Sequence, residues 1–162
     1  HRKEVDIYAN AETSERIQQT FSYIFDENTY KGGGIPRVKV NEITGGKFSV
    51  SGQEVTPLIY NHGPTMVYGF RLGDFAYMTD CNYIPESEFE KLKGLKVLVL
   101  DALRYKPHPT HFSIDEAIEA ARWIGAKQTY FTHMTHDVVH AEANAKLPGG
   151  IELAYDGMEF EI

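Results

Sequence analysis

Histidines concentrate in the stretch QTYFTHMTHDVVHAE, residues 128–142. His133, His136 and His140 fall within eight positions there, directly after a run that favours β-structure. Chance, or a helix face of hydrogen-bonded imidazoles, would explain this simply. The third explanation is a metal site, because imidazole is a common metal ligand. The other side chains that lie nearby must decide between them.

Metal-competent side chains also follow three further strand-like runs. Each is the last residue of its run, and the four positions are His62 in PLIYNH, Asp80 in FAYMTD, Asp101 in KVLVLD and His133 in QTYFTH. The loop after the third run adds His108 and His111 in the motif HPTH. Taken singly, such residues are more simply hydrogen-bonded histidines or turn-forming aspartates. Because strands of one sheet end along a common edge, their recurrence predicts one site.

Histidine and carboxylate ligands without cysteine are typical of a catalytic zinc, manganese or iron site. A carboxylate can also bridge two cations, and two-metal sites suit hydrolysis at phosphorus or at a carbonyl carbon. Water bound to such cations ionises near neutral pH and becomes the nucleophile. A histidine beside the ligands, with an ordinary pKa of about 6.5, suits proton donation to the leaving group.

The elements that must position these residues can be read from apolar periodicity and capping signals. The predicted helices cover residues 11–25, 84–94, 113–125 and 137–150, the third with a capping box of Ser113 and Glu116 and the last capped by Asp137. The predicted strands cover 5–9, 54–62, 96–103 and 128–133, with hairpins at 65–80 and at 151–162 around Asp156–Gly157. We expect an α+β fold in a single domain, residues 1–162.

Composition excludes several classes of protein. A net charge of −7 and a pI near 5.5 argue against a broad basic face for nucleic acid. The single cysteine, Cys81, cannot form an internal disulfide and fits a reducing compartment, so we expect a cytoplasmic protein. No apolar run approaches the roughly 18 residues that a membrane span needs. We expect a small-molecule substrate, and a homo-oligomer is left open.

Three stretches carry a family resemblance: HGPTMVYGFRLGDFAYMTDCNYIPE, HPTHFSIDEAIEAARWIGAKQTYFTHMTHD and GGIELAYDGMEFEI. Together they resemble the second half of a metallo-β-lactamase-fold hydrolase. The branch they are most similar to is the phosphoribosyl cyclic-phosphate phosphodiesterase-like group, relatives of the carbon–phosphorus lyase pathway enzyme. The resemblance implies the C-terminal portion of an αββα sandwich.

By the same resemblance, His62 is a ligand of the first metal, Asp80 bridges both metals and His133 binds the second. His111 matches the histidine that serves as proton donor in the phosphodiesterase branch. Three further residues are expected just outside the metal ligands: His136, which would orient a ligand or the substrate, Asp101, which supports the site or equally the HPTH loop, and His108, which shapes that loop. The implied cofactors are two divalent ions, zinc or manganese.

The family's H-x-H-x-D-H loop, which supplies the other metal ligands, does not occur in the 162 residues. We therefore expect a C-terminal portion that lacks the N-terminal strands and this loop, and that binds metal weakly and catalyses little alone. The predicted function is a metal-dependent phosphodiesterase acting on a small cyclic or diester phosphate. The alternatives are another hydrolase of this fold, such as a thioesterase, lactonase or nuclease, and a non-catalytic binding or assembly module.

Overall fold

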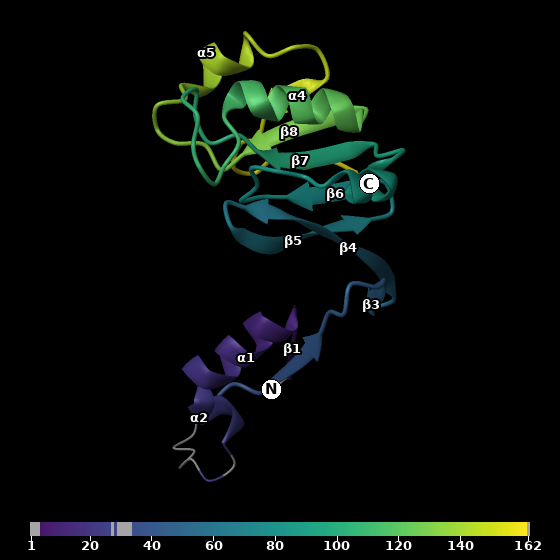
Figure 1. Ribbon diagram of the computed structural model, residues 1–162, viewed down its shortest axis with the longest axis vertical. Helices are drawn as coiled ribbons and strands as arrows, with labels where there is room; N and C mark the ends of the chain where they lie inside the picture. Colours follow the sequence, from purple (N-terminus) through teal and green to yellow (C-terminus); the bar gives the residue numbers. More distant parts are fainter. Residues whose placement is uncertain (1–3, 27, 29–33, 162) are drawn as a thin grey trace. The chain divides into compact units, whose positions relative to one another are not determined.

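The computed structural model describes residues 4–26, 28 and 34–161 (Figure 1). The chain divides into two compact units, residues 1–46 and residues 47–162. Each unit is described by itself, and the prediction of a single domain stays a prediction.

The first unit contains a two-stranded parallel sheet and a short helical segment. Strand β1 (Val5–Ala9) pairs with β2 (Val38–Glu42). Helix α1 (Ala11–Thr20) begins at Asn10, whose side chain accepts a hydrogen bond from the Thr13 amide at 2.8 Å. The predicted helix was continuous to residue 25, but it breaks at residue 21 and α2 (Ser22–Phe25) follows. The glycine run at 32–34 lies largely outside the described residues.

The second unit is built on a seven-stranded mixed sheet in the order β3-β4-β5-β6-β7-β8-β9. Its strands are β3 (Phe48–Val50), β4 (Gln53–His62), β5 (Thr65–Leu72), β6 (Phe75–Met78), β7 (Val97–Asp101), β8 (Gln128–Thr132) and β9 (Ile151–Leu153). Its helical elements are η1 (Glu86–Glu88), α3 (Phe89–Leu92), α4 (Ile114–Ile124) and α5 (His140–Asn144). Strands β3 to β6 pair antiparallel, and β6 to β9 pair parallel.

Strand β7, which lies between β6 and β8, is buried along its whole length, as its continuous apolar run predicts. Helix α4 connects it to the parallel strand β8 and has the predicted capping box of Ser113 and Glu116, with Gly125 at φ 70° ending the helix. Because its apolar stripe faces the sheet, α4 fixes both strands against one core.

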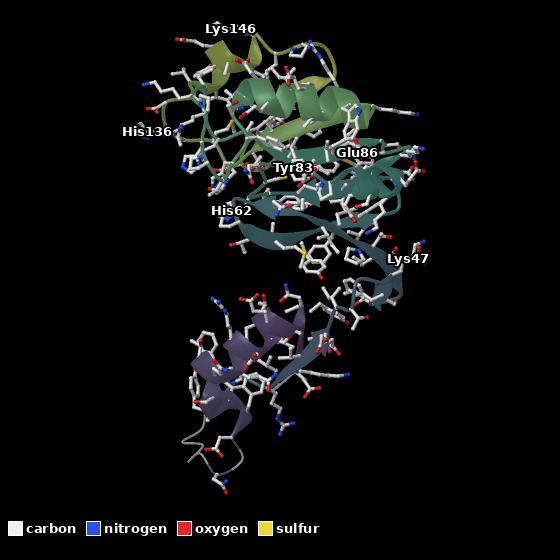
Figure 2. The ribbon with its side chains drawn as sticks, viewed as in Figure 1. Lys47, His62, Tyr83, Glu86, His136 and Lys146 are labelled. Atoms are coloured by element: carbon white, nitrogen blue, oxygen red, sulfur yellow. The ribbon has the colours of Figure 1, made fainter. Side chains whose placement is uncertain are left out.

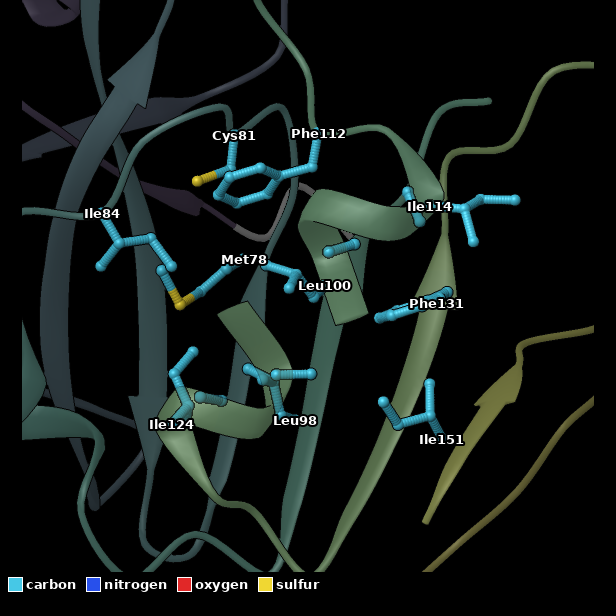
Figure 3. Close-up of a cluster of buried hydrophobic side chains, with 14 of the residues drawn as sticks. Met78, Cys81, Ile84, Leu98, Leu100, Phe112, Ile114, Ile124, Phe131 and Ile151 are labelled. Carbon is cyan, nitrogen blue, oxygen red and sulfur yellow. The ribbon is translucent and has the colours of Figure 1, made fainter. Parts of the chain in front are cut away.

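That core lies on the sheet face that α4 covers (Figure 3). Alternate residues of β6 and β7 point into it, including Met78, Leu98 and Leu100, which are fully buried. Ile114 and Ile124 meet them from the two ends of α4. Cys81 is also fully buried in this cluster.

The direction of the strands brings the predicted site residues to one edge. Since β4 and β6 are both antiparallel to β5, and β6, β7 and β8 are parallel, all four strands run the same way. Their arrowheads point to the same side in Figure 1, and His62 is labelled at that edge in Figure 2. The sequence placed a metal-competent side chain at the end of each of these four strands.

Two predictions near the C-terminus differ from the structure. The predicted helix at 137–150 is present only as α5 (His140–Asn144). It begins after Val139 without a side-chain cap, so Asp137 is not its cap, and the Asp137 carboxylate pairs with His136 at 3.2 Å. The closing hairpin around Asp156–Gly157 does not form among the described residues. Only β9 is a strand, and Phe160 packs on the rings of Phe75 and Tyr130 instead of continuing a ladder. Within the described part of the chain, no helix has the length and apolarity to cross a bilayer.

Candidate metal centre

Four side chains converge at the edge where β4, β6 and β8 end. Ligand atoms of Asp80, His111 and His133 all lie within 4.8 Å of one another. His133 Nε2 lies 3.1 Å from Asp80 Oδ1, and His62 Nε2 lies 3.1 Å from His111 Nε2. The structure therefore brings together the three predicted metal ligands and the predicted proton donor.

The backbone is unusual at two of these residues. Asp80 has φ 60° and His133 has φ 62°, and Ser51 is the other non-glycine residue with positive φ in the described part of the chain. Left-handed backbone costs a residue with a Cβ on the order of 1–3 kcal/mol and recurs at functional sites. At the ends of β6 and β8 it turns the chain sharply, which aims both side chains back toward the edge.

Asp101 lies beneath the cluster and is fully buried. Its Oδ1 accepts a hydrogen bond from the Cys81 amide at 2.9 Å, and its Oδ2 lies 3.4 Å from His111 Nδ1. Burial raises the pKa of Asp101 to about 7. Burial, followed by the charges of His62 and His133, lowers the pKa of His111 below the usual histidine value. Nδ1 of His111 therefore faces Asp101, and Nε2 of the same ring faces His62.

The donors present fit a divalent cation. The Nε2 atoms of His62 and His111 lie 3.1 Å apart, at a distance where a proton on one ring can hydrogen-bond to the lone pair of the other. Asp101 Oδ2 and His111 Nδ1 are buried without a hydrogen-bond partner among the described residues. Nitrogen and carboxylate oxygen donors without sulfur suit zinc or manganese.

Two of the remaining predicted residues behave differently. His108 stays close: its Nδ1 lies 3.2 Å from Thr110 Oγ1, and its ring centroid lies 5.2 Å from that of His111. Its role in shaping the HPTH loop stays a prediction. The His136 side chain is 96% exposed and pairs with Asp137, so the structure does not bring it to the cluster.

Asn82 was missed by the sequence reasoning. Its Oδ1 accepts a hydrogen bond from the Gly63 amide at 2.7 Å, and its Nδ2 donates to the Pro109 carbonyl at 3.1 Å. The available signal was its place two residues after Asp80, in the sequence TDCNY. An amide side chain in a turn is too common to have been singled out on that ground.

A family profile described as the beta-lactamase superfamily domain matches residues 1–134. A solved structure described as a new diphosphatase from the PhnP family is 40% identical, with a TM-score of 0.86. The similarity covers 99% of this chain and 60% of that chain. The metallo-beta-lactamase fold protein YhfI from Bacillus subtilis is 20% identical with a TM-score of 0.72, over 96% of this chain and 64% of that one.

A curated relative from Porphyromonas gingivalis, named octanoyltransferase, is 33% identical over 160 residues. The similarity covers 97% of this chain but 32% of the relative. The chain thus spans about a third of this relative and 60% of the diphosphatase.

Proposed function

The chain belongs to the beta-lactamase superfamily, and we propose that it acts as a metal-dependent phosphodiesterase on a small cyclic or diester phosphate. The predicted α+β metallo-β-lactamase fold is confirmed, and the family supports a hydrolase in general. The observation that carries the proposal is the cluster of Asp80, His111 and His133, with His62 beside it, on one sheet edge. The likeness to a diphosphatase at 40% identity favours phosphorus over carbon as the reacting centre.

In this proposal His62, Asp80 and His133 would hold two divalent cations, zinc or manganese. When bound, such cations neutralise phosphoryl charge and lower the pKa of water, which makes a nucleophile available near neutral pH. Two ligands per cation from these residues are fewer than the roughly three protein ligands usual at catalytic zinc. Further ligands would have to come from residues outside this set.

His111 would donate the proton that the leaving oxygen needs. Its Nε2 faces His62, while Asp101 Oδ2 at 3.4 Å from Nδ1 limits rotation of the ring. Since burial and the neighbouring histidines lower the pKa of His111, a phosphodiester monoanion close to Nε2 would favour its protonation. Asp101 and His108 serve in this scheme as positioning residues.

The first test is elemental analysis of the purified protein, followed by hydrolysis of a phenyl phosphodiester, whose leaving group needs a proton, with added zinc or manganese. We expect bound metal to fall with His133→Ala, whereas His111→Ala should keep metal and lose about 10²–10⁴-fold in rate. His140→Ala, a histidine whose ring contacts Tyr155 away from the cluster, is the matched control. Equal rates for His111→Ala and His140→Ala would sink the proton-donor role.

A second candidate, a thioesterase, is favoured by the name of the octanoyltransferase relative, which indicates acyl chemistry in that protein. Water activated by cations at the same site could attack a thioester carbonyl carbon. Assaying an octanoyl thioester beside the phosphodiester separates the two candidates, because each predicts turnover of one substrate only.

The setting of the protein is part of the proposal. We propose a cytoplasmic protein on the strength of its single, buried and free cysteine, which fits a reducing compartment. The proposed partner is the small phosphodiester substrate, and the net charge of −7 disfavours a nucleic acid.

A further inference from the structure

The Asn82 side chain ties together two loops that carry site residues. It accepts a hydrogen bond from Gly63, the residue after His62, and donates one to Pro109 in the HPTH loop. Its own backbone is fixed to β4, because the Asn82 amide donates to the Asn61 carbonyl at 2.9 Å and the Asn61 amide donates to the Tyr83 carbonyl at 2.9 Å. The Asn82 side chain therefore hydrogen-bonds to both loops, while the Asn82 backbone is itself hydrogen-bonded to β4.

The two loops also touch at Gly63. A Cβ at this position would lie 2.7 Å from Thr110 Cγ2, closer than side chains pack. Gly63 has φ 60°, so glycine there permits both the turn and the close approach. The contact places Thr110 and the adjacent His111 directly against the end of β4.

A further bond holds the far side of the HPTH loop. The Phe112 amide donates to the Cys81 carbonyl at 2.7 Å. His111 thus lies between Pro109, bonded to Asn82, and Phe112, bonded to Cys81. Cys81 and Asn82, which follow Asp80, therefore each form a hydrogen bond to the HPTH loop, one on each side of His111.

We infer that Asn82 is a positioning residue that sets the place of His111 relative to His62, and through it the delivery of the proton to the leaving group. The inference rests on the phosphodiesterase proposed above and adds a specific residue to it. Without the Asn82 carboxamide, no side chain joins Gly63 to Pro109. The 3.1 Å distance between His62 Nε2 and His111 Nε2 is then no longer supported by these two hydrogen bonds. The hydrogen bonds of the Asn82 side chain go to Gly63 and Pro109 and not to the proposed ligands Asp80 and His133.

The distinguishing readout is dependence on the leaving group. Phenol is a weaker acid than 4-nitrophenol, so a phenyl phosphodiester needs the proton donor far more than a 4-nitrophenyl phosphodiester does. For Asn82→Ala we expect kcat on the phenyl diester to fall about 10–100-fold with little change in KM. On the 4-nitrophenyl diester the fall should stay under about threefold, with metal content unchanged.

Asn144→Ala is the matched control, because Asn144 Oδ1 accepts a hydrogen bond from the Leu153 amide at the same 2.7 Å, between α5 and β9. The Asn144→Ala variant also loses a side-chain hydrogen bond to a backbone amide. It should lower kcat on the two diesters by the same factor or leave both unchanged. A second pair tests the contact itself: Gly63→Ala should show the leaving-group effect. Gly73→Ala should not show the leaving-group effect. Gly73 is also a turn glycine with positive φ, but a Cβ added there would meet open space.

A readout without activity comes from the metal-free protein. Amide hydrogen exchange at Gly63 should become about tenfold faster in Asn82→Ala, and the ring resonances of His111 should shift. In Asn144→Ala only Leu153 should respond. The inference is overturned if Asn82→Ala lowers both substrates equally, or if Gly63 exchange and the His111 resonances do not change. If the wild-type protein hydrolyses neither diester, the proposed function fails. The hydrogen-exchange experiment still decides whether the Asn82 side chain positions Gly63 and His111.

Discussion

Each ring nitrogen of His111 has a polar side chain opposite it, and this makes these neighbours as informative as the ring itself. Nδ1 faces Asp101, which no solvent reaches, and Nε2 faces His62. A carboxylate that is buried with one oxygen unpaired is expensive to ionise, which is why the pKa of Asp101 rises to about 7. The residue that steadies the proposed proton donor therefore destabilises the metal-free fold when it is charged.

This predicts that, in the metal-free protein, Asp101→Asn becomes more stable relative to the wild type as the pH rises. The unfolded carboxyl has a pKa of about 3.9, and the folded one is raised, so between these values the native state binds more protons. Stability from this group is then lost as pH rises toward 7. Urea unfolding in EDTA should be measured at pH 5, 6, 7 and 8. The free energy of unfolding of Asp101→Asn should rise relative to that of the wild type as the pH rises, by a few kcal/mol at most. A gap independent of pH would contradict the assignment.

The sequence predicted much of this site because the site residues are also strand ends. His62, Asp80 and His133 could be found since apolar runs stop at them and the strands share an edge. Asn82 could not be found, because its importance comes from two hydrogen bonds to loops 19 and 27 positions away along the chain. The exposure of His136 was equally hidden, since it depends on how the chain turns after the left-handed residue His133.

Among the elements, β4 shows how a sheet edge is closed. Strand β3 pairs with β4 only as far as Val55, so the outer edge of β4 beyond that point lacks a strand partner in the described chain. Glu88 in η1 covers it: its Oε2 accepts a hydrogen bond from the Ile59 amide at 2.9 Å and also pairs with Lys91 at 2.9 Å. The carboxylate is largely buried, so both partners depend on it.

We expect Glu88→Ala to lower the free energy of unfolding by about 1–3 kcal/mol, because it leaves the Ile59 amide without an acceptor. Glu90→Ala removes an exposed pair with Lys93 on the next element and should have a much smaller effect. Denaturant unfolding of both variants provides the comparison. Equal losses for the two glutamates would show that Glu88 is a surface charge only.

Other elements could be predicted only in part. The helix at 114–124 was predicted with its cap and its stop, because Ser113, Glu116 and Gly125 act locally. The predicted C-terminal hairpin was wrong, because the packing of Phe160 on Tyr130 and Phe75 involves residues far apart in sequence. Local turn chemistry at Asp156–Gly157 could not reveal that competition.

For the whole second unit, the site joins segments that are distant along the chain. Its proposed ligands come from the ends of β4, β6 and β8, so a bound cation would cross-link them in the native state only. We expect added zinc to raise the melting temperature, with a stabilisation of about 2.7 kcal/mol when free cation exceeds its dissociation constant a hundredfold. EDTA should reverse the shift, Asp80→Asn should reduce it, and His140→Ala should keep it. A shift that survives Asp80→Asn would place the cation elsewhere.

The left-handed backbone at Asp80 and His133 has a consequence for the protein's evolution in the laboratory. Glycine would relax either position by on the order of 1 kcal/mol, yet it removes a proposed ligand. A library selected for heat resistance in EDTA should therefore accumulate glycine or asparagine at 80 and 133, whereas a library selected for zinc retention should reject glycine there. Sequencing the two survivor pools would show whether stability and activity compete at the same two codons. Identical pools would mean that these turns are kept for folding alone.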